Sequence, residues 1–156
     1  MQKIVYILFC LLLVLFSGCV KDDEPRSLVG VGDTLPHFEV TMNDGCVVSD
    51  LTLRGREAWI VFFNTGCADC RRELPRLEAV HRSRPELTIV CIARSEDAAS
   101  VAAFWRENDL TLPYSPQPDA SVYHLFATSG IPRLYVADAS GRITAVYSEK
   151  GFPELS

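Results

Sequence analysis

Residues 58–70 read AWIVFFNTGCADC, an unbroken apolar run followed by a short polar turn and two cysteines. Such a continuous apolar run is typical of a central strand that is buried on both faces of a sheet. Beyond it, Leu74, Leu77 and Val80 recur at helical spacing among charged residues, which predicts an amphipathic helix over 68–82. The two thiols therefore lie where a buried strand passes into a helix.

The segments on either side complete an α/β pattern. The expected elements are a hairpin of residues 35–40 and 46–48 around Asn43-Asp44-Gly45, a strand over 87–93, helices over 98–108 and 119–127, and a hairpin of residues 134–136 and 143–147. This order predicts a single α/β domain with a mixed central sheet flanked by helices.

Composition excludes several classes of protein. The chain has 156 residues, of which 48% are hydrophobic and 22% charged, which fits one globular domain. Its formal net charge is −5, and the absence of a basic run argues against a nucleic-acid partner. Collagen-like, coiled-coil, repeat and multi-span membrane architectures are also excluded.

The first residues have the anatomy of a secretory signal peptide. Lys3 supplies a positive start, and the apolar residues 4–16 are fewer than the roughly 20 that span a bilayer. Small residues then precede Cys19, as in the lipoprotein signals of Bacteroidetes, which this segment resembles. We expect a signal peptide over 1–18, lipid on Cys19 and a tether over 19–32, with an uncleaved membrane anchor as the alternative.

The remaining chain, residues 33–156, is expected to form the folded domain. Lipid on Cys19 implies a protein anchored to a membrane of the cell envelope, on its periplasmic face or its outer surface. The acidic tract at 21–24 resembles a surface-routing signal, although a solvated linker explains it equally well.

The spacing of Cys67 and Cys70 predicts redox chemistry. A helix N-terminus stabilises negative charge, and the thiolate is the form of cysteine that attacks a disulfide. Cys67 would form a mixed disulfide with the substrate, and Cys70 would then attack Cys67 and release the reduced substrate. CxxC pairs also bind zinc, but the strand-to-helix context favours a redox dithiol.

These motifs together resemble the TlpA/ResA-like thiol–disulfide oxidoreductases, envelope proteins of the AhpC/TSA-redoxin superfamily. The resemblance rests on residues 59–75, on Gly32–Phe38 and on Ser129-Gly130-Ile131-Pro132, and it runs from about Gly32 to Tyr147. It implies a thioredoxin-like fold with an N-terminal β-hairpin extension. The family usually adds a C-terminal helix, which is short or missing in this sequence.

The resemblance also assigns roles to residues. Cys67 matches the nucleophile and Cys70 the resolving thiol. Pro132 matches a cis-proline, whose geometry leaves the backbone of Ile131 free to pair with a bound peptide. Glu73 matches an acidic residue that relays the proton of the dithiol, and the alternative is a first-turn glutamate that only complements the helix dipole.

Two departures from the family pattern bear on substrate and direction. Gly66 stands where an aromatic residue is common, which leaves Cys67 more open to substrates. Asp69 replaces a proline, and its negative charge disfavours the reduced form, whereas Arg71 has the opposite effect. The balance favours a reductant.

The implied partners are protein thiols or disulfides and a membrane electron donor of the disulfide-reductase type. No metal or cofactor is expected beyond a redox-active Cys67–Cys70 disulfide.

One alternative function is that of a peroxiredoxin-like peroxidase, although Thr65 and Phe63 fit the peroxidase motif poorly. Others are a copper carrier that uses both thiols and His124, and a non-catalytic interaction module. Cys46 and Cys91 are expected to pack as small apolar residues, and a bridge between them stays open.

Overall fold

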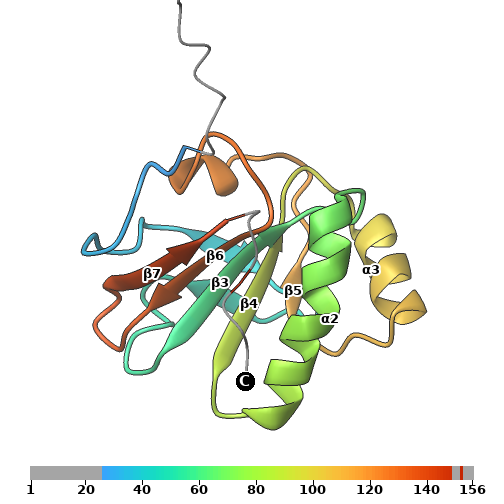
Figure 1. Cartoon of the computed structure of the whole chain (residues 1–156), viewed down its shortest axis with the longest axis horizontal. Helices are drawn as coiled ribbons and strands as arrows, with labels where there is room; N and C mark the ends of the chain where they lie inside the picture. Colours follow the sequence, from blue (N-terminus) through green and yellow to red (C-terminus); the bar gives the residue numbers. More distant parts are fainter. Residues whose placement is uncertain (1–25, 149–151, 153–156) are drawn as a thin grey trace, which may run out of the picture.

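The computed structural model describes residues 26–148 and 152 (Figure 1). The expected signal peptide over 1–18, lipidated Cys19 and residues 19–25 of the tether lie outside the described residues. The elements are β1 (Glu39–Thr41), β2 (Val47–Ser49), β3 (Ala58–Phe63), α2 (Ala68–Ser83), β4 (Thr88–Ala93), α3 (Ala98–Glu107), β5 (Tyr114–Ser115), η2 (Tyr123–Leu125), β6 (Arg133–Ala137) and β7 (Ile143–Tyr147).

Five strands form a mixed sheet in the order β5-β4-β3-β6-β7. Strand β3 lies in the middle and is parallel to β4 and antiparallel to β6. All six of its residues are buried, as the apolar run predicted. The short β1–β2 hairpin forms a sheet of its own. The predicted α/β architecture with a mixed central sheet is therefore confirmed.

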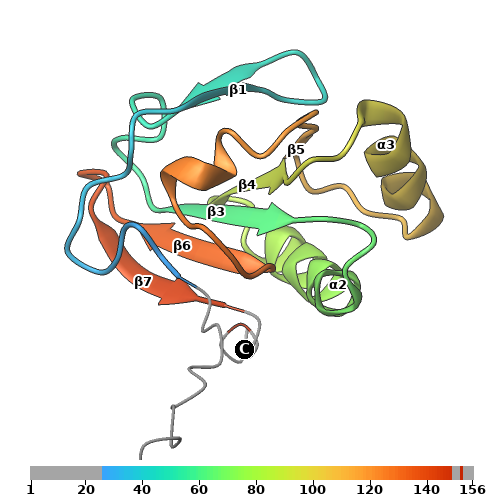
Figure 2. The ribbon, with the colours of Figure 1, turned by 90° about the horizontal axis from the view of Figure 1, so that it is seen from above.

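Each face of the sheet carries its own hydrophobic core, because side chains alternate between faces along a strand. The helix-side core lies under α2 and α3 and contains Trp59, Val61, Phe63, Cys70, Leu74, Leu77, Cys91, Val101, Phe104, Trp105 and Phe152. The hairpin-side core contains Phe38, Val40, Ile60, Phe62, Tyr123, Phe126 and Tyr135. Figure 2 shows α2 on one side of the sheet and β1 on the other. Both faces of β3 are thus covered.

The region after α3 differs from the prediction in one wrong element and one missed element. Residues 119–127 were expected to form a helix, but only the 3-10 turn η2 is present. The Asp119 side chain accepts a hydrogen bond from Ser121 N at 2.8 Å, a local turn that competes with helix formation. Strand β5 was not predicted, since it is two residues long and Pro113 and Pro116 flank it.

The segment that precedes β1 is hydrogen-bonded to the domain. Ser27 forms a β-bridge with Ala127, and the bond from Leu28 N to Phe126 O, 2.8 Å, belongs to the same contact. These bonds occupy the backbone at the end of the predicted 119–127 helix. Part of the expected tether therefore packs on the domain.

Both edge strands of the large sheet are paired at one position with a segment from the N-terminal part of the chain. At β5, Asn43 N donates to Tyr114 O at 2.7 Å, and the Asn43 side chain accepts from Tyr114 N at 3.1 Å. At the start of β7, Gly32 N donates to Ile143 O at 2.9 Å, and Ile143 N donates to Asp33 O at 2.8 Å. The backbone groups that an edge strand would expose are paired at these positions.

The remaining cysteines differ from each other. Cys91 is fully buried in the helix-side core, as expected, whereas Cys46 is exposed just outside β2. The packing role predicted for Cys46 is therefore wrong, because the hairpin turn places this residue at the surface. Both are free thiols, so no bridge joins them.

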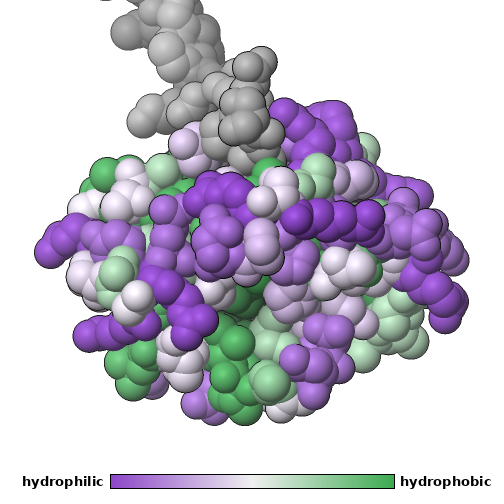
Figure 3. All heavy atoms as spheres, turned by 90° about the horizontal axis from the view of Figure 1, so that it is seen from below, coloured by the Kyte–Doolittle hydropathy of each residue, from purple (hydrophilic) through white to green (hydrophobic). Residues whose placement is uncertain are grey.

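The surface is mixed in character. Figure 3 shows one face, largely hydrophilic, with hydrophobic residues gathered between its centre and its lower edge. Within residues 26–148, no helix combines the length and the apolar character needed to cross a bilayer.

A buried carboxylate fastens α2 to the segment between α3 and β5. Glu78 accepts hydrogen bonds from Thr111 N at 2.7 Å, from Thr111 Oγ1 at 2.6 Å and from Leu112 N at 3.0 Å. Arg82 Nε also donates to it at 2.7 Å. Burial opposes ionisation, but these bonds outweigh it, so the pKa of Glu78 lies below its ordinary value.

We predict that Glu78→Gln lowers the free energy of unfolding by about 2 kcal/mol at about pH 7, since charged hydrogen bonds to a buried group are lost. Because the folded-state pKa is lowered, the contribution is present above the ordinary value of 4.5 and is lost as pH falls through the folded-state value. The difference between wild type and variant should therefore shrink at about pH 3.

Urea denaturation at both pH values measures this difference. Glu86→Gln is the matched control, because Glu86 is exposed and pairs only with Arg84 among the described residues. A Glu78→Gln loss no larger than that of the control would contradict the prediction.

Candidate functional site

Cys67 is the N-cap of α2. Its backbone is extended, and its Sγ accepts a hydrogen bond from Cys70 N at 3.4 Å. The sulfur therefore lies at the positive end of the helix, where unpaired N–H groups and the macrodipole favour a negative charge. The side chain is partly exposed, and both cysteines are free thiols in the structure. This geometry suits an attacking thiol.

The loop before β6 lies against this sulfur. The Ile131–Pro132 peptide bond is cis, as the resemblance implied. Cys67 Sγ lies 3.6 Å from Ile131 O. Among the described residues, Ile131 N has no backbone hydrogen-bond partner. Thus the backbone predicted to pair with a bound peptide lies beside the predicted nucleophile.

Cys70 occupies a different environment one helical turn further on. It is fully buried in the helix-side core, next to Leu74. Burial raises the pKa of the Cys70 thiol well above its ordinary value, and the nearby Cys67 and Asp69 add to the rise. The pair therefore combines an accessible thiol with one that is shielded from solvent, which fits the predicted nucleophile and resolving thiol.

The turn before Cys67 is fixed by polar side chains. Asn64 accepts a hydrogen bond from Gly66 N at 2.9 Å and donates to Arg94 O at 3.2 Å. Glu96 accepts bonds from Thr65 N, at 2.9 Å, and from the Thr65 hydroxyl. A Cβ on Gly66 would lie 3.1 Å from the Asn64 side-chain oxygen, so a larger residue there would require this side chain to shift by a few tenths of an ångström. Gly66 itself is exposed, as expected for an open approach to the thiol.

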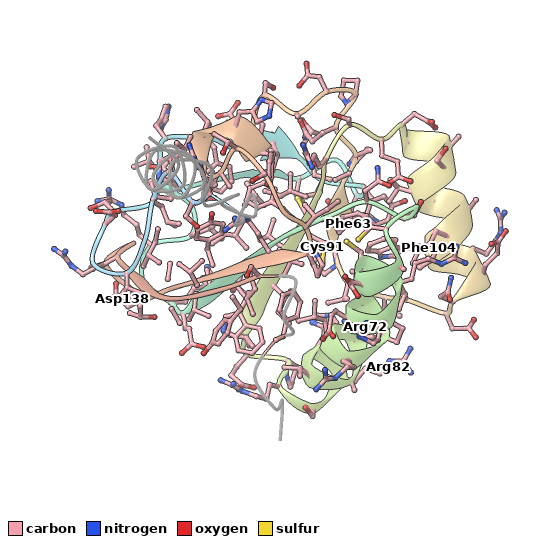
Figure 4. The ribbon with its side chains drawn as sticks, turned by 45° about the horizontal axis from the view of Figure 1, so that its top comes forward. Phe63, Arg72, Arg82, Cys91, Phe104 and Asp138 are labelled. Atoms are coloured by element: carbon pink, nitrogen blue, oxygen red, sulfur yellow. The ribbon has the colours of Figure 1, made fainter. Side chains whose placement is uncertain are left out.

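Charged residues surround the first turns of α2 (Figure 4). Asp69 forms an ion pair with Arg72 at 2.7 Å, which offsets the effect of its negative charge on the dithiol. Glu73 is buried, and Arg72 and Arg76 donate hydrogen bonds to it at 3.2 and 3.1 Å. Among the described residues, these arginines rather than either thiol are its hydrogen-bond partners. The proton-relay role of Glu73 stays a prediction.

Figure 4 shows how the labelled side chains are arranged around α2. Phe63 and Cys91 lie between the sheet and the helix, while Phe104 projects from α3 toward it. Arg71 lies over the Phe104 ring, 5.6 Å from its centroid. Asp138 marks the opposite end of the sheet, at the β6–β7 turn. The site therefore lies at one end of the sheet, between α2, α3 and the loop before β6.

Sequence reasoning missed two residues that hold this site together, Glu96 and Arg133. Glu96 fixes the turn before Cys67, and the buried Arg133 donates to backbone carbonyls of the cis-proline loop. The only sequence signal for Arg133 was a charged residue at the start of a predicted apolar strand. Nothing in the sequence distinguished Glu96 from other surface carboxylates.

The alternatives weighed from the sequence find little support in this geometry. The Thr65 hydroxyl donates to Glu96, so it is engaged away from Cys67. His124 is exposed on η2, beside the Tyr123 ring. In the part of the chain that the structure describes, no group of three or more potential ligand side chains is placed to hold a metal ion.

Comparison with known proteins identifies the family. The model of the AhpC/TSA family matches residues 31–146, well over half of the chain. The chain belongs to the AhpC/TSA family. The family match begins just before the segment that covers the start of β7 and ends within β7 itself.

Individual relatives agree with this assignment. The thiol-disulfide oxidoreductase ResA of Bacillus cereus is 23% identical over 131 residues, which cover 83% of this chain and 74% of that protein. ResA of Oceanobacillus iheyensis is 25% identical over 151 residues, with 93% and 78% covered. A solved structure from Bacteroides thetaiotaomicron, described as that of a candidate protein disulfide isomerase, has a TM-score of 0.76 at 27% identity, with 83% and 85% covered. The predicted thioredoxin-like fold and the TlpA/ResA-like resemblance are confirmed.

Proposed function

We propose that this protein is a lipid-anchored thiol–disulfide oxidoreductase of the cell envelope that reduces protein disulfides through Cys67 and Cys70. The observation that carries the proposal is the placement of Cys67 Sγ at the N-terminus of α2, 3.6 Å from Ile131 O in the cis-proline loop. The enzyme class itself, a thiol–disulfide oxidoreductase, is confirmed by the relatives of the chain.

The proposed reaction transfers two electrons from the dithiol to a substrate disulfide. The Cys67 thiolate attacks one substrate sulfur, which breaks the substrate disulfide and releases the other sulfur as a thiolate that takes up a proton. Cys70 then loses its proton and attacks Cys67 Sγ. This step forms the Cys67–Cys70 disulfide and releases the second substrate thiol. A membrane electron donor of the disulfide-reductase type would return two electrons and two protons to the enzyme.

The reducing direction is the finer part of the proposal, and two features act on it in opposite senses. A dithiol whose reduced form is stabilised acts as an oxidant, and the N-cap position of Cys67 stabilises its thiolate. The negative charge of Asp69, between the two cysteines, disfavours a thiolate and supports a reductant, although its ion pair with Arg72 weakens this effect.

Peptide binding is assigned to the backbone beside Pro132. Ile131 would pair with an extended substrate segment by main-chain hydrogen bonds, which give affinity without requiring one sequence. Gly66 would keep the approach to Cys67 clear of a bulky side chain. The substrate class is therefore an exposed disulfide in an extended or unfolded protein segment.

We predict that Cys67→Ser abolishes the protein-catalysed part of insulin reduction by dithiothreitol and leaves only the direct reaction of the reagent, because the attacking thiolate at position 67 is lost. When the reduced Cys70→Ser variant is mixed with insulin in the absence of dithiothreitol, it should instead accumulate a mixed disulfide, visible on a non-reducing gel. Cys46→Ser is the matched control, since Cys46 is an exposed free thiol outside the site, and it should keep full activity. Full activity of Cys67→Ser would refute the proposal.

The reduction potential of the Cys67–Cys70 couple tests the direction. We expect a value of about −270 mV or below, near that of thioredoxin, because the Asp69 charge disfavours the thiolate that the reduced form carries. Equilibration in dithiothreitol and glutathione buffers, followed by thiol alkylation, gives the potential. A value near about −120 mV would instead indicate an oxidant.

Anchoring is tested separately from catalysis. We predict that Cys19→Ser moves the protein from the membrane fraction to the soluble fraction, because the acyl chains supply the membrane affinity. Labelling with a palmitate analogue, read on a gel, should be lost in the same variant. Cys10→Ser is the control, since Cys10 lies within the expected signal peptide. Unchanged labelling in Cys19→Ser would contradict lipid attachment there.

A further inference from the structure

Arg133 is a buried charge in an unusual position. It directly follows Pro132 at the start of β6, and only 1% of its surface is exposed. Among the described residues it forms no ion pair with a carboxylate. A buried charge is costly unless it is hydrogen-bonded, and the planar guanidinium meets this requirement through several donors in fixed directions.

The acceptors of Arg133 are backbone carbonyls of the cis-proline loop. Ser129 O accepts from Nε at 3.0 Å and from Nη2 at 2.8 Å, and Gly130 O accepts from Nε at 3.2 Å. The Tyr123 hydroxyl also donates to Gly130 O, at 2.8 Å. These bonds fix two successive peptide groups immediately before Ile131.

The guanidinium acts from the face of the sheet opposite α2. Arg133 pairs in register with Phe62, and Phe62 belongs to the hairpin-side core, whereas Cys67 packs against the helix-side core. Arg133 can therefore influence the dithiol only indirectly, through the backbone of the cis-proline loop that it bonds.

A third acceptor connects this loop to the N-terminal segment. Arg133 Nη1 donates to Ser27 Oγ at 2.7 Å. Residues 26–28 run beside residues 126–129, where Thr128 N donates to Arg26 O at 2.9 Å. Arg26 N also donates to the Ser129 hydroxyl at 3.2 Å. One side chain thus contacts both the cis-proline loop and the segment that leads into the domain.

We propose that Arg133 is a positioning residue that orients the backbone of residues 129–131 for pairing with a substrate peptide and ties this loop to residues 26–28. The inference rests on the proposed function, because it concerns how the same site accepts protein substrates. A substrate that pairs with the Ile131 backbone depends on this orientation. A small disulfide that meets only the sulfur of Cys67 does not.

Single-turnover kinetics with two disulfides separate these cases. We expect Arg133→Met to slow oxidation of the reduced protein by insulin about tenfold, since displaced binding groups cost rates of this order or more. Its reaction with 5,5′-dithiobis(2-nitrobenzoate) should change less than about twofold, because no backbone pairing is involved. Arg133→Lys keeps the charge and part of the donor set, and it should restore part of the insulin rate. Equal losses on both disulfides, or no loss on insulin, would overturn the inference.

Amide hydrogen exchange gives a readout that does not depend on activity. Arg133→Met should speed exchange at Leu28 and Thr128 by about tenfold or more, while amides of β3 keep their protection. Ser115→Ala is the matched control, because Ser115 is a buried hydroxyl bonded to Thr41 O, remote from the loop. Unchanged exchange in Arg133→Met would overturn the inference.

The two proposals fail in different ways. If the wild type reduces no insulin but exchange in Arg133→Met rises as expected, the proposed function fails, and of the inference only the tie between the loop and residues 26–28 stands. If Arg133→Met does not fold, Ser27→Ala carries the test, because it removes the acceptor of Nη1 and otherwise only a long contact of 3.5 Å with the Tyr135 hydroxyl. Faster exchange at Leu28 and Thr128 in Ser27→Ala supports the coupling, and unchanged exchange refutes it.

Discussion

The burial of β3 on both faces is the constraint on which the candidate site depends. Its six residues lie between the helix-side and hairpin-side cores, so neither the strand nor its end can shift without disturbing both. Because β4 runs parallel to β3 and β6 runs antiparallel, the loops after β3 and β4 and the loop before β6 meet at one end of the sheet. The topology thus assembles the dithiol turn, the Glu96 loop and the cis-proline loop at one place.

Where these three loops meet, side chains bond to the backbone and hold it in place. Glu96 holds Thr65, and Asn64 in turn bonds to the backbone of Arg94. Arg133 holds the carbonyls of Ser129 and Gly130. The position of Cys67 relative to Ile131 O is therefore a property of three connected loops, and the helix N-terminus supplies only part of the chemistry. Preorganisation of this kind allows a site to bind a substrate without first rearranging.

Much of this arrangement was predictable because local pattern and tertiary packing agreed. The apolar run of β3 and the amphipathic α2 satisfy the same core, so their sequence periods were sufficient. The prediction failed where a distant segment took part. The end of the expected helix over 119–127 pairs instead with residues 26–28, and the two-residue strand β5 bonds to Asn43, which is distant in the sequence. Arg133 was missed because burial of a charge depends on acceptors that only the folded loop provides.

The pairing at both edge strands of the large sheet has a consequence for aggregation. An unpaired edge strand is a template on which another chain can add a strand, and this is a route to aggregation. Asn43 occupies the outer side of β5, prolines flank that strand, and residues 32–33 occupy the start of β7. At these positions the backbone groups of the edge strands are already paired, so they cannot take up an extended segment of another chain.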